Sequence, residues 1–224
     1  CYGGGNGTAA VAVAGGSSPY NYSWNNGQTT STAYGLFPGI QSVNVFDANG
    51  CLASNNITIT QPQSLSATTS VSFVSCNAGS DGAINLTVNG GTSPYLFNWS
   101  TGATSTSLSG LASLSGLVAG TYSVTVTDSC SASVTQAVQI TQPGALSLSK
   151  IVSDVKCNGA NNGSASLTVS GGVLPYVYSW STGATTASGS GLAIGTYYVT
   201  VSDNCGKTAV DSAAVSQPLT LNTS

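Results

Sequence analysis

Short segments in which apolar and polar residues alternate recur along the whole chain. Ala83–Val88, Tyr122–Thr127 and Ser133–Thr141 follow a period of two, which predicts strands with one buried and one exposed face. Val, Ile, Thr and Tyr are frequent in such segments, and Gly, Asn and Ser separate them at turn spacing. No window shows the 3.6-residue period of an amphipathic helix, so we expect an all-β protein.

The segments belong to a unit that occurs three times. A Gly-Gly-x-x-Pro-Tyr stretch leads each time to a tryptophan, and these tryptophans lie 75 and 81 residues apart. A Gln-Pro pair closes each unit, and the second unit carries extra residues within 107–117 that we expect to form a loop. Repeats of this length with many turn signals predict three tandem immunoglobulin-like β-sandwiches. Their expected boundaries are residues 1–62, 63–143 and 144–218.

The position of the Gln-Pro pairs predicts where each sandwich takes its first strand. Thirteen alternating residues, Gln63–Ser75 and Gly144–Lys156, separate a Gln-Pro pair from the next opening cysteine. Repeat 1 begins at Cys1 without such a segment, and residues 219–224 have its pattern with no repeat after them. Unmatched sheet edges favour strand addition. The chain is therefore interpreted as a slice of a longer array, or as a subunit whose tail completes the first repeat of the next copy; a trimmed fragment with frayed ends is the third interpretation.

Composition excludes several classes of function. Charged residues make up 4% of the chain, with three lysines, six aspartates and no histidine. Arginine and glutamate are absent too, so we expect no nucleic-acid partner, no imidazole base and no histidine metal ligand. No apolar run reaches the length of a membrane span, and we expect no membrane insertion. A mean hydropathy of +0.19 with so few ions predicts a surface covered by sugar or by neighbouring subunits.

The cysteines form a regular framework. One early and one late cysteine occur in each repeat, and no Cys-x-x-Cys pair is present, so we expect disulfides rather than metal ligands. Pairing within a repeat gives every copy the same bond and predicts Cys1–Cys51, Cys76–Cys130 and Cys157–Cys205. The competing pattern joins neighbouring repeats through Cys51–Cys76 and Cys130–Cys157 and leaves Cys1 and Cys205 unpaired. Either pattern requires an oxidising compartment.

Aromatic residues alternate along the strand that ends at each tryptophan. Trp24, Trp99 and Trp180 share a face with the tyrosines or phenylalanine that precede them. We expect these side chains to form the sandwich cores, with tryptophan against a disulfide. The alternative is a solvent-facing stripe that stacks sugar rings.

Single aspartates come just before each late cysteine. Asp47, Asp128 and Asp203 end a predicted strand, where one carboxylate could join backbone carbonyls around calcium. One carboxylate per site is poor for calcium, so we interpret each as an Asx-type turn. The chain lacks a paired carboxylate or an activated serine, and we expect neither an enzyme nor a cofactor.

Glycan acceptors are frequent. Asn21 and Asn98 lie opposite in phase to the tryptophans and would face outward. Sugars there would hydrate a surface that ions do not. The full set of Asn-x-Ser/Thr candidates is Asn6, Asn21, Asn56, Asn85, Asn98, Asn162 and Asn222.

The order of motifs resembles the SprB-type repeat of giant surface adhesins in gliding bacteria. The motifs that carry the resemblance are Cys157-Asn158-Gly159, Gly-Gly-x-x-Pro-Tyr-x-x-x-Trp, Thr101–Thr104, Thr182–Thr185, Leu117–Asp128, Leu192–Asp203, the late cysteine and Gln-Pro. Repeat 1 departs from the pattern at Gly39-Ile40-Gln41 and at Asn25–Gln28. The resemblance implies export, surface display and a role in adhesion or motility, and it supplies no catalytic residues. It also implies an O-glycan pattern that Asp211-Ser212-Ala213 matches, with Ser212 as the acceptor.

These observations together favour a structural role outside the cell. We interpret the chain as a subunit or repeat segment of an extracellular, glycosylated bacterial fibre or adhesin, whose partners are copies of itself joined head to tail into a helical filament. Surface polysaccharide is a second candidate partner. The alternative function is an array of carbohydrate-binding modules.

Overall fold

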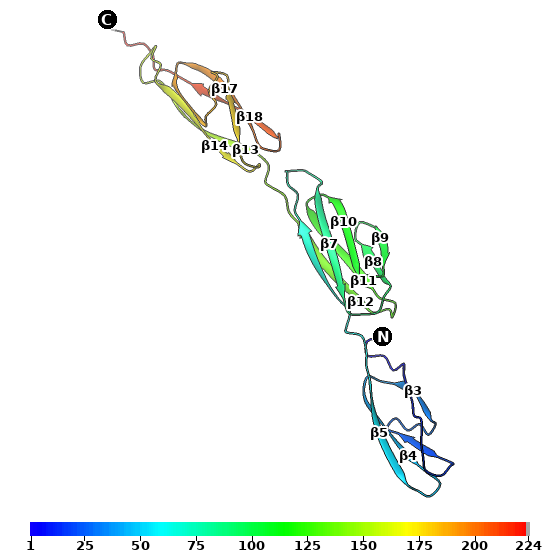
Figure 1. The fold of residues 1–224 in the computed structure, drawn as a ribbon. Coiled ribbons are helices and arrows are strands. Elements are labelled where there is room, and N and C mark those ends of the chain that lie inside the picture. Colours follow the sequence, from blue (N-terminus) through cyan, green and yellow to red (C-terminus); the bar gives the residue numbers. More distant parts are fainter. Residues whose placement is uncertain (223–224) are drawn as a thin grey trace. The chain divides into compact units, whose positions relative to one another are not determined.

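The computed structural model describes residues 1–222, and in this range the chain is built of strands (Figure 1). The all-β prediction is confirmed. Repeat 1 contains β1 (Gly7–Ala10), β2 (Asn21–Trp24), β3 (Thr32–Leu36), β4 (Gly39–Phe46) and β5 (Leu52–Ile59). Repeat 2 contains β6 (Ser66–Ser72), β7 (Gly82–Asn89), β8 (Tyr95–Trp99), β9 (Thr104–Ser107), β10 (Leu111–Leu117), β11 (Gly120–Thr127) and β12 (Ser133–Ile140). Repeat 3 contains β13 (Ser147–Ser153), β14 (Gly163–Ser170), β15 (Val177–Trp180), β16 (Ser188–Leu192), β17 (Gly195–Ser202) and β18 (Thr208–Val215).

Repeat 3 shows the sandwich architecture most simply. One antiparallel sheet has the order β13-β14-β16 and the other the order β15-β17-β18. Their inner faces meet in one apolar cluster, to which β14 contributes Ala165 and Leu167 and β17 contributes Val199 and Val201. Apolar residues alternate with polar ones along both strands, so one face of each sheet is buried. This is the two-sheet arrangement of an immunoglobulin-like domain.

Repeat 2 has the same two sheets with one added strand. Their orders are β10-β7-β6 and β12-β11-β8-β9. The loop predicted for residues 107–117 is wrong: β9 ends at Ser107 and pairs with β8, and Leu111–Leu117 forms β10. The extra residues are accommodated because β9 and β10 each lie at the edge of a sheet.

Repeat 1 has a smaller sheet on one side. The pair β1-β3 faces the three strands β2-β4-β5, and Trp24, Leu36 and Val43 lie in the cluster between them. Strand β1 has four residues, whereas its counterpart β14 has eight and pairs with β13 along seven of them. Repeat 1 has no strand in the place of β13 within the described residues.

The chain divides into two compact units that do not follow the repeat boundaries. One comprises Cys1–Ser70, Asn85–Ser113 and Tyr122–Val138; the other comprises Val71–Ile84, Leu114–Thr121 and Gln139–Ser224. Repeat 1 thus lies within the first unit and repeat 3 within the second. The three-domain boundaries given above remain a prediction.

The Gly-Gly-x-x-Pro-Tyr motif forms a closed loop before the aromatic strand. Gly171 and Gly172 have φ values of +69° and +64°, which side-chain-bearing residues rarely adopt. The hydroxyl of Tyr176 donates a hydrogen bond to the Gly171 carbonyl, and the peptide before Pro175 is cis. The same tyrosine-to-glycine bond recurs in the other repeats, at 2.8 Å in each.

We expect Trp180→Ala to destabilise repeat 3 by about 3–5 kcal/mol, because a large buried side chain is removed. The indole is 4% exposed, and its N–H donates to the Thr186 carbonyl at 2.8 Å. Thermal unfolding followed by circular dichroism measures the loss. Tyr198→Ala, at a site that is 60% exposed in the same repeat, is the matched control and should change the stability little.

Candidate functional site

An aspartate holds the turn that carries each late cysteine. Asp203 accepts hydrogen bonds from the backbone N–H groups of Cys205 and Lys207 at 2.9 Å and of Val173 at 3.0 Å. The carboxylate thereby joins the β17–β18 turn to the loop before β15. Asp128 and Asp47 make the equivalent three bonds in their own repeats. These are Asx-type turns with one further contact each.

Backbone hydrogen bonds lower the pKa of two of these carboxyl groups. For Asp203, burial raises the pKa, but the bonds from Lys207, Val173 and Cys205 outweigh it and the net pKa is lowered. For Asp47, bonds from Cys51 and Ser17 lower the pKa. Both turns therefore depend on an ionised carboxylate.

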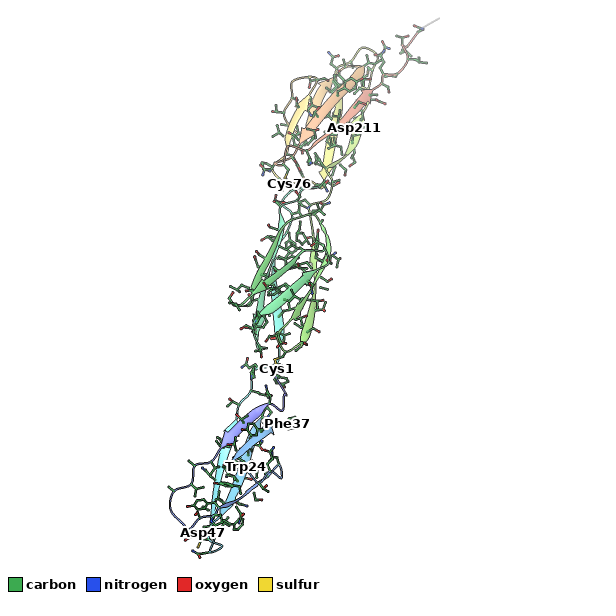
Figure 2. The ribbon with its side chains drawn as sticks, turned by 90° about the vertical axis from the view of Figure 1, so that its right-hand side faces the viewer. Cys1, Trp24, Phe37, Asp47, Cys76 and Asp211 are labelled. Atoms are coloured by element: carbon green, nitrogen blue, oxygen red, sulfur yellow. A yellow bond between two sulfur atoms is a disulfide. The ribbon has the colours of Figure 1, made fainter. Side chains whose placement is uncertain are left out.

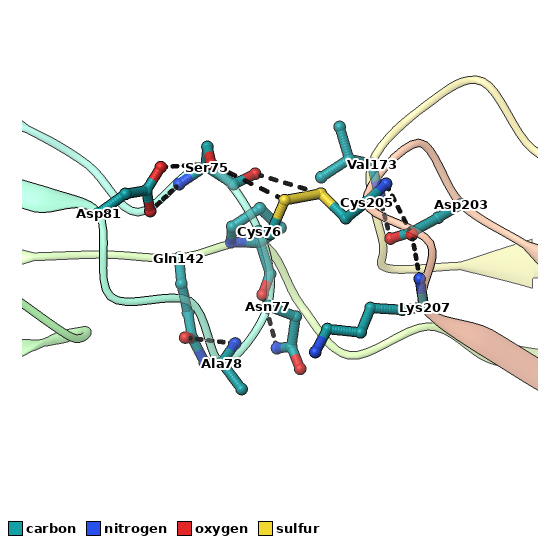
Figure 3. The surroundings of a disulfide bond; sticks show 11 residues. Ser75, Cys76, Asn77, Ala78, Asp81, Gln142, Val173, Asp203, Cys205 and Lys207 are labelled. Carbon is teal, nitrogen blue, oxygen red and sulfur yellow. Dashed lines mark hydrogen bonds between the residues drawn. A yellow bond between two sulfur atoms is a disulfide. The ribbon is translucent and has the colours of Figure 1, made fainter.

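The Gln-Pro pair at the end of a repeat holds the loop of that repeat's early cysteine. At Cys76, Ala78 N–H donates to Gln142 Oε1 at 2.9 Å, and Asn77 Nδ2 donates to the Pro143 carbonyl at 2.9 Å. These two bonds fix the backbone on the side of Cys76 that leads into β7. Figure 3 shows this loop beside the disulfide.

The disulfides join each early cysteine to the late cysteine of the following repeat. Cys1 pairs with Cys130 and Cys76 pairs with Cys205, each across 129 residues, with Cα–Cα distances of 5.6 and 5.8 Å. The predicted bonds within repeats, Cys1–Cys51, Cys76–Cys130 and Cys157–Cys205, are therefore wrong. The competing pattern, Cys51–Cys76 with Cys130–Cys157, is wrong as well.

Strand geometry explains why a bond within a repeat does not form. In repeat 3, Cys157 precedes the Gly163 end of β14, whereas the turn of Cys205 is bonded through Asp203 to Val173, beyond the Ser170 end. Eight residues of strand separate these ends by about 25 Å. A disulfide needs Cα atoms within roughly 7 Å. The constant separation of 129 residues was the signal in the sequence that could have revealed the pairing.

Two cysteines remain free in the part of the chain that the structure describes. Cys51 and Cys157 are both exposed. Cys157 occupies the early position that the disulfides use elsewhere. Cys51 lies in a late turn, but at the place of Lys207, two residues further along than the place of Cys205.

An open groove runs along repeat 1, between residues 10–16 and strand β5. Three adjoining clefts, of about 200, 270 and 40 Å³, form it. Val13 and Val45 line two of them, and Cys51 lies at the end beside Gly16. In repeat 3, β13 lies in this place, paired with β14 and also in contact with β18.

Side chains of β5 are exposed, as expected if no strand of repeat 1 takes the place that β13 has in repeat 3. Ile57 is 42% exposed, whereas Ala213, at the same place in β18, is 1% exposed. Within residues 1–222, this edge of the repeat 1 sandwich is therefore uncovered.

The three tryptophans lie in the interior. Trp24, Trp99 and Trp180 are 3%, 6% and 4% exposed (Figure 2 labels Trp24). The Trp24 indole N–H donates to the Thr30 carbonyl at 2.9 Å. These rings are not available to stack on a sugar, which removes the platform that carbohydrate-binding modules would need at these positions.

The candidate glycan acceptors are accessible. Every asparagine candidate is exposed, and Asn21 and Asn98 face away from the buried tryptophans. The seven are Asn6, Asn21, Asn56, Asn85, Asn98, Asn162 and Asn222. Ser212 is half-buried on β18, and its carbonyl accepts a hydrogen bond from Lys150 Nζ. Lys150 also forms an ion pair with Asp211 at 2.7 Å. Glycosylation of any of them remains a prediction.

Neither a metal cluster nor a membrane helix is found in residues 1–222. No group of three or more His, Cys, Asp or Glu side chains gathers there at metal-binding distance. Likewise, this range contains no helix with the length and apolarity to cross a membrane.

The fold and the repeated junction define the chain as a tandem array of disulfide-linked β-sandwiches. Comparison with protein families gives the particular class: the SprB repeat matches at residues 1–29, 68–104 and 149–185. The chain belongs to the SprB repeat family, as its motifs predicted. Together with the disulfides, this family indicates a surface or secreted protein.

Solved structures give only distant likenesses. Sidekick-1 immunoglobulin domains 1-5 align at 12% identity over 88% of this chain and 52% of that chain, with a TM-score of 0.38. The N-terminal four Ig domains of Dscam1 isoform 9.44 align at 14% identity over 88% and 64%, with a TM-score of 0.32. A C-terminal fragment of intimin, in complex with the intimin-binding domain of its translocated receptor, aligns at 17% identity over 70% and 64%, with a TM-score of 0.31.

This chain thus spans about half of the Sidekick-1 fragment and less than two thirds of the other two. Among curated proteins, none matches the sequence.

Peptide mapping under non-reducing conditions should recover Cys1 linked to Cys130 and Cys76 linked to Cys205. The expectation follows from the bonded geometry of both pairs. Proteolysis followed by mass spectrometry identifies the linked peptides. Recovery of Cys76 linked to Cys130 as the main product would contradict the structure.

Stability should fall with acid as the turns held by Asp47 and Asp203 lose their ionised carboxylates. The pKa values of Asp47 and Asp203 are lowered in the folded state, so their stabilising contribution is present above the ordinary aspartate pKa and is lost as pH falls below it. The melting temperature should therefore drop between about pH 5 and pH 2. Asp203→Asn should lower it at pH 7 and flatten this dependence; an unchanged pH slope would exclude the role of Asp203.

Proposed function

We propose that this chain is a structural subunit of an extracellular fibre, in which copies join head to tail by strand addition. The single observation that carries the proposal is the groove in repeat 1 between residues 10–16 and β5. An extended segment with alternating apolar residues fits such a groove, because its backbone can pair with the free edge while alternate side chains enter the core.

The segment after Pro218 of a second copy is the proposed occupant. In repeats 2 and 3, the third residue after the Gln-Pro pair is a leucine that packs against the second glycine of the Gly-Gly motif. A β-carbon added to Gly91 would lie 2.8 Å from Leu65 Cδ1, and one added to Gly172 would lie 2.9 Å from Leu146 Cδ1.

The corresponding leucine after Pro218 is Leu221, which is 96% exposed. The corresponding glycine in repeat 1 is Gly16, which borders the open cleft. The chain therefore carries both halves of the contact. Since the two halves are different surfaces, repetition of the contact generates an open filament and not a closed pair.

The low content of ionic groups supports a mechanical role. The charged side chains are six aspartates and three lysines, and histidine is absent. Side chains that move protons near neutral pH are thus missing, so we infer that the protein is not an enzyme. Association covers part of the weakly charged surface, and glycans on the exposed asparagines would hydrate the rest.

A groove-blocking variant tests the proposal. Val13→Asp places a charge in the groove and should shift the sedimentation of the purified 224-residue chain from large species to monomers. Val210→Asp, at a site on β18 that is 66% exposed, is the matched control and should leave assembly unchanged. Circular dichroism confirms that each variant is folded.

A synthetic peptide of Gly144–Ser153 provides a second readout. Because this segment is the strand that occupies the equivalent place in repeat 3, it should compete for the groove and shorten fibres seen by electron microscopy. A scrambled peptide should not. If wild-type protein stays monomeric at every concentration and in every redox state, the proposal fails.

A further inference from the structure

We propose that Cys157 of one copy forms a disulfide with Cys51 of the next copy, so that the fibre is closed covalently at every subunit junction. This inference rests on the proposed function and names the bond that locks its interface. It extends between copies the pairing rule that the chain follows within itself, early cysteine to the late cysteine of the following repeat.

The early half of the junction is already built around Cys157. Gly159 N–H donates to Gln217 Oε1 at 3.0 Å, and Asn158 Nδ2 donates to the Pro218 carbonyl at 3.1 Å. The same two positions make the same two bonds beside Cys76.

A third contact recurs on the other side of the cysteine. Lys156 N–H donates to Asn162 Oδ1 at 3.0 Å, as Ser75 N–H does to Asp81 Oδ1. The backbone around the free thiol of Cys157 is therefore fixed as it is around bonded Cys76.

The late half is the turn that Asp47 holds around Cys51. Asp47 accepts from the N–H groups of Asn49 and Cys51 at 2.9 Å and from that of Ser17 at 3.1 Å. Asp203 holds the turn of bonded Cys205 through the same three bonds. In this comparison Asn49 corresponds to Cys205, and Cys51 corresponds to Lys207, two residues further along the turn. Both free cysteines are exposed and open to a partner. The bond uses the thiol two residues beyond the position of Cys205, within the same turn.

The cleft beside Cys51 determines where Cys157 of the second copy lies when its tail binds. Cys51 and Gly16 line the same cleft of about 200 Å³. In repeat 3, the turn of bonded Cys205 also carries Asp203, and Asp203 lies against Gly172, the glycine that Leu146 contacts. Entry of Leu221 of another copy beside Gly16 would place that copy's Cys157 at the turn of Cys51, because Cys157 and Leu221 line one cleft on their own chain.

The bond forms by exchange with the disulfide of a small thiol. The Cys157 thiolate attacks one sulfur of that disulfide and releases one small thiol. The Cys51 thiolate of the next copy then attacks Cys157 Sγ in the mixed disulfide and releases the second. The two protons lost by the cysteines end on the two small thiols, and the small disulfide is the oxidant that is reduced.

Three serine variants of the 224-residue chain test the bond in the presence of oxidised small thiol. Wild-type protein should give a ladder of covalent multimers on a non-reducing gel. Cys51→Ser alone and Cys157→Ser alone should each remain monomeric. A mixture of these two variants should stop at a covalent dimer, since it holds one free Cys157 and one free Cys51 per pair. The double variant should give no ladder.

Isotope labelling identifies the partner of each thiol. After mixing ¹⁵N-labelled and unlabelled wild-type chains, the peptide of Cys157 should be found linked to that of Cys51 with labels from different chains. A bond within one chain, a Cys157–Cys157 or Cys51–Cys51 dimer, or a link from Cys51 to a different repeat sequence in native material would each overturn the proposal.

Leu221→Ser tests whether the leucine guides the reaction. It should slow ladder formation by about tenfold or more, because burial of the leucine no longer drives association. Leu108→Ser is the matched control: Leu108 is 78% exposed in repeat 2, outside both the groove and the tail, and its replacement should leave the rate unchanged.

Electron microscopy of the double serine variant separates the two proposals. If wild-type protein under oxidising conditions forms filaments of normal length while Cys51 and Cys157 both stay free thiols, the disulfide is refuted and the fibre proposal stands. Absence of any assembly by wild-type protein would refute both. Shorter, dissociable filaments from the double variant, with a covalent ladder from wild-type protein, support both.

Discussion

Each sandwich after the first depends on a strand that enters from the preceding Gln-Pro pair. β6 pairs with β7, and β13 pairs with β14 along its whole length. The entering chain also passes under the Gly-Gly loop, where Gly171 lies so close that an added β-carbon would be 2.0 Å from the Ala145 carbonyl oxygen. Only glycine permits both this approach and the positive φ, which gives the Gly-Gly motif its role at the junction.

The few charges of this protein are used mainly to fix turns. Every aspartate accepts at least one backbone N–H: Asp47, Asp81, Asp128, Asp154, Asp203 and Asp211. A carboxylate that satisfies several backbone donors rigidifies a loop more effectively than an exposed ion pair on the surface. Aspartates thus fix the turns of the late cysteines, and glutamine and asparagine side chains fix the loops of the early cysteines.

Cross-repeat pairing changes what a disulfide does in an array. A bond within one sandwich would stabilise that repeat alone, and the link to its neighbour would remain a single polypeptide strand. A bond between consecutive repeats adds a second covalent connection at the junction, beside the linker strand. Tension along such an array would then be shared by two covalent paths, and the array would resist separation of repeats even if hydrogen bonds at a junction were broken.

The sequence by itself determined the class of fold, the three repeats, the SprB family and the inward phase of the tryptophans. Each of these depends on short-range periodicity or on motif order, which the chain displays directly. The strand in residues 111–117 was missed, because its leucines recur every three residues and do not follow a period of two.

Tertiary structure alone decided the cysteine partners and the course of the groove. Symmetry among repeats allows an early cysteine to pair with the late cysteine of its own repeat or of the next one. Only the length of β14 and the position of the Asp203 turn exclude a disulfide within a repeat. The groove likewise exists because residues 10–16 and β5 are neighbours across the sandwich. Distances between segments that are far apart in sequence are set by strand length and sheet packing, and the order of residues along the chain does not contain them.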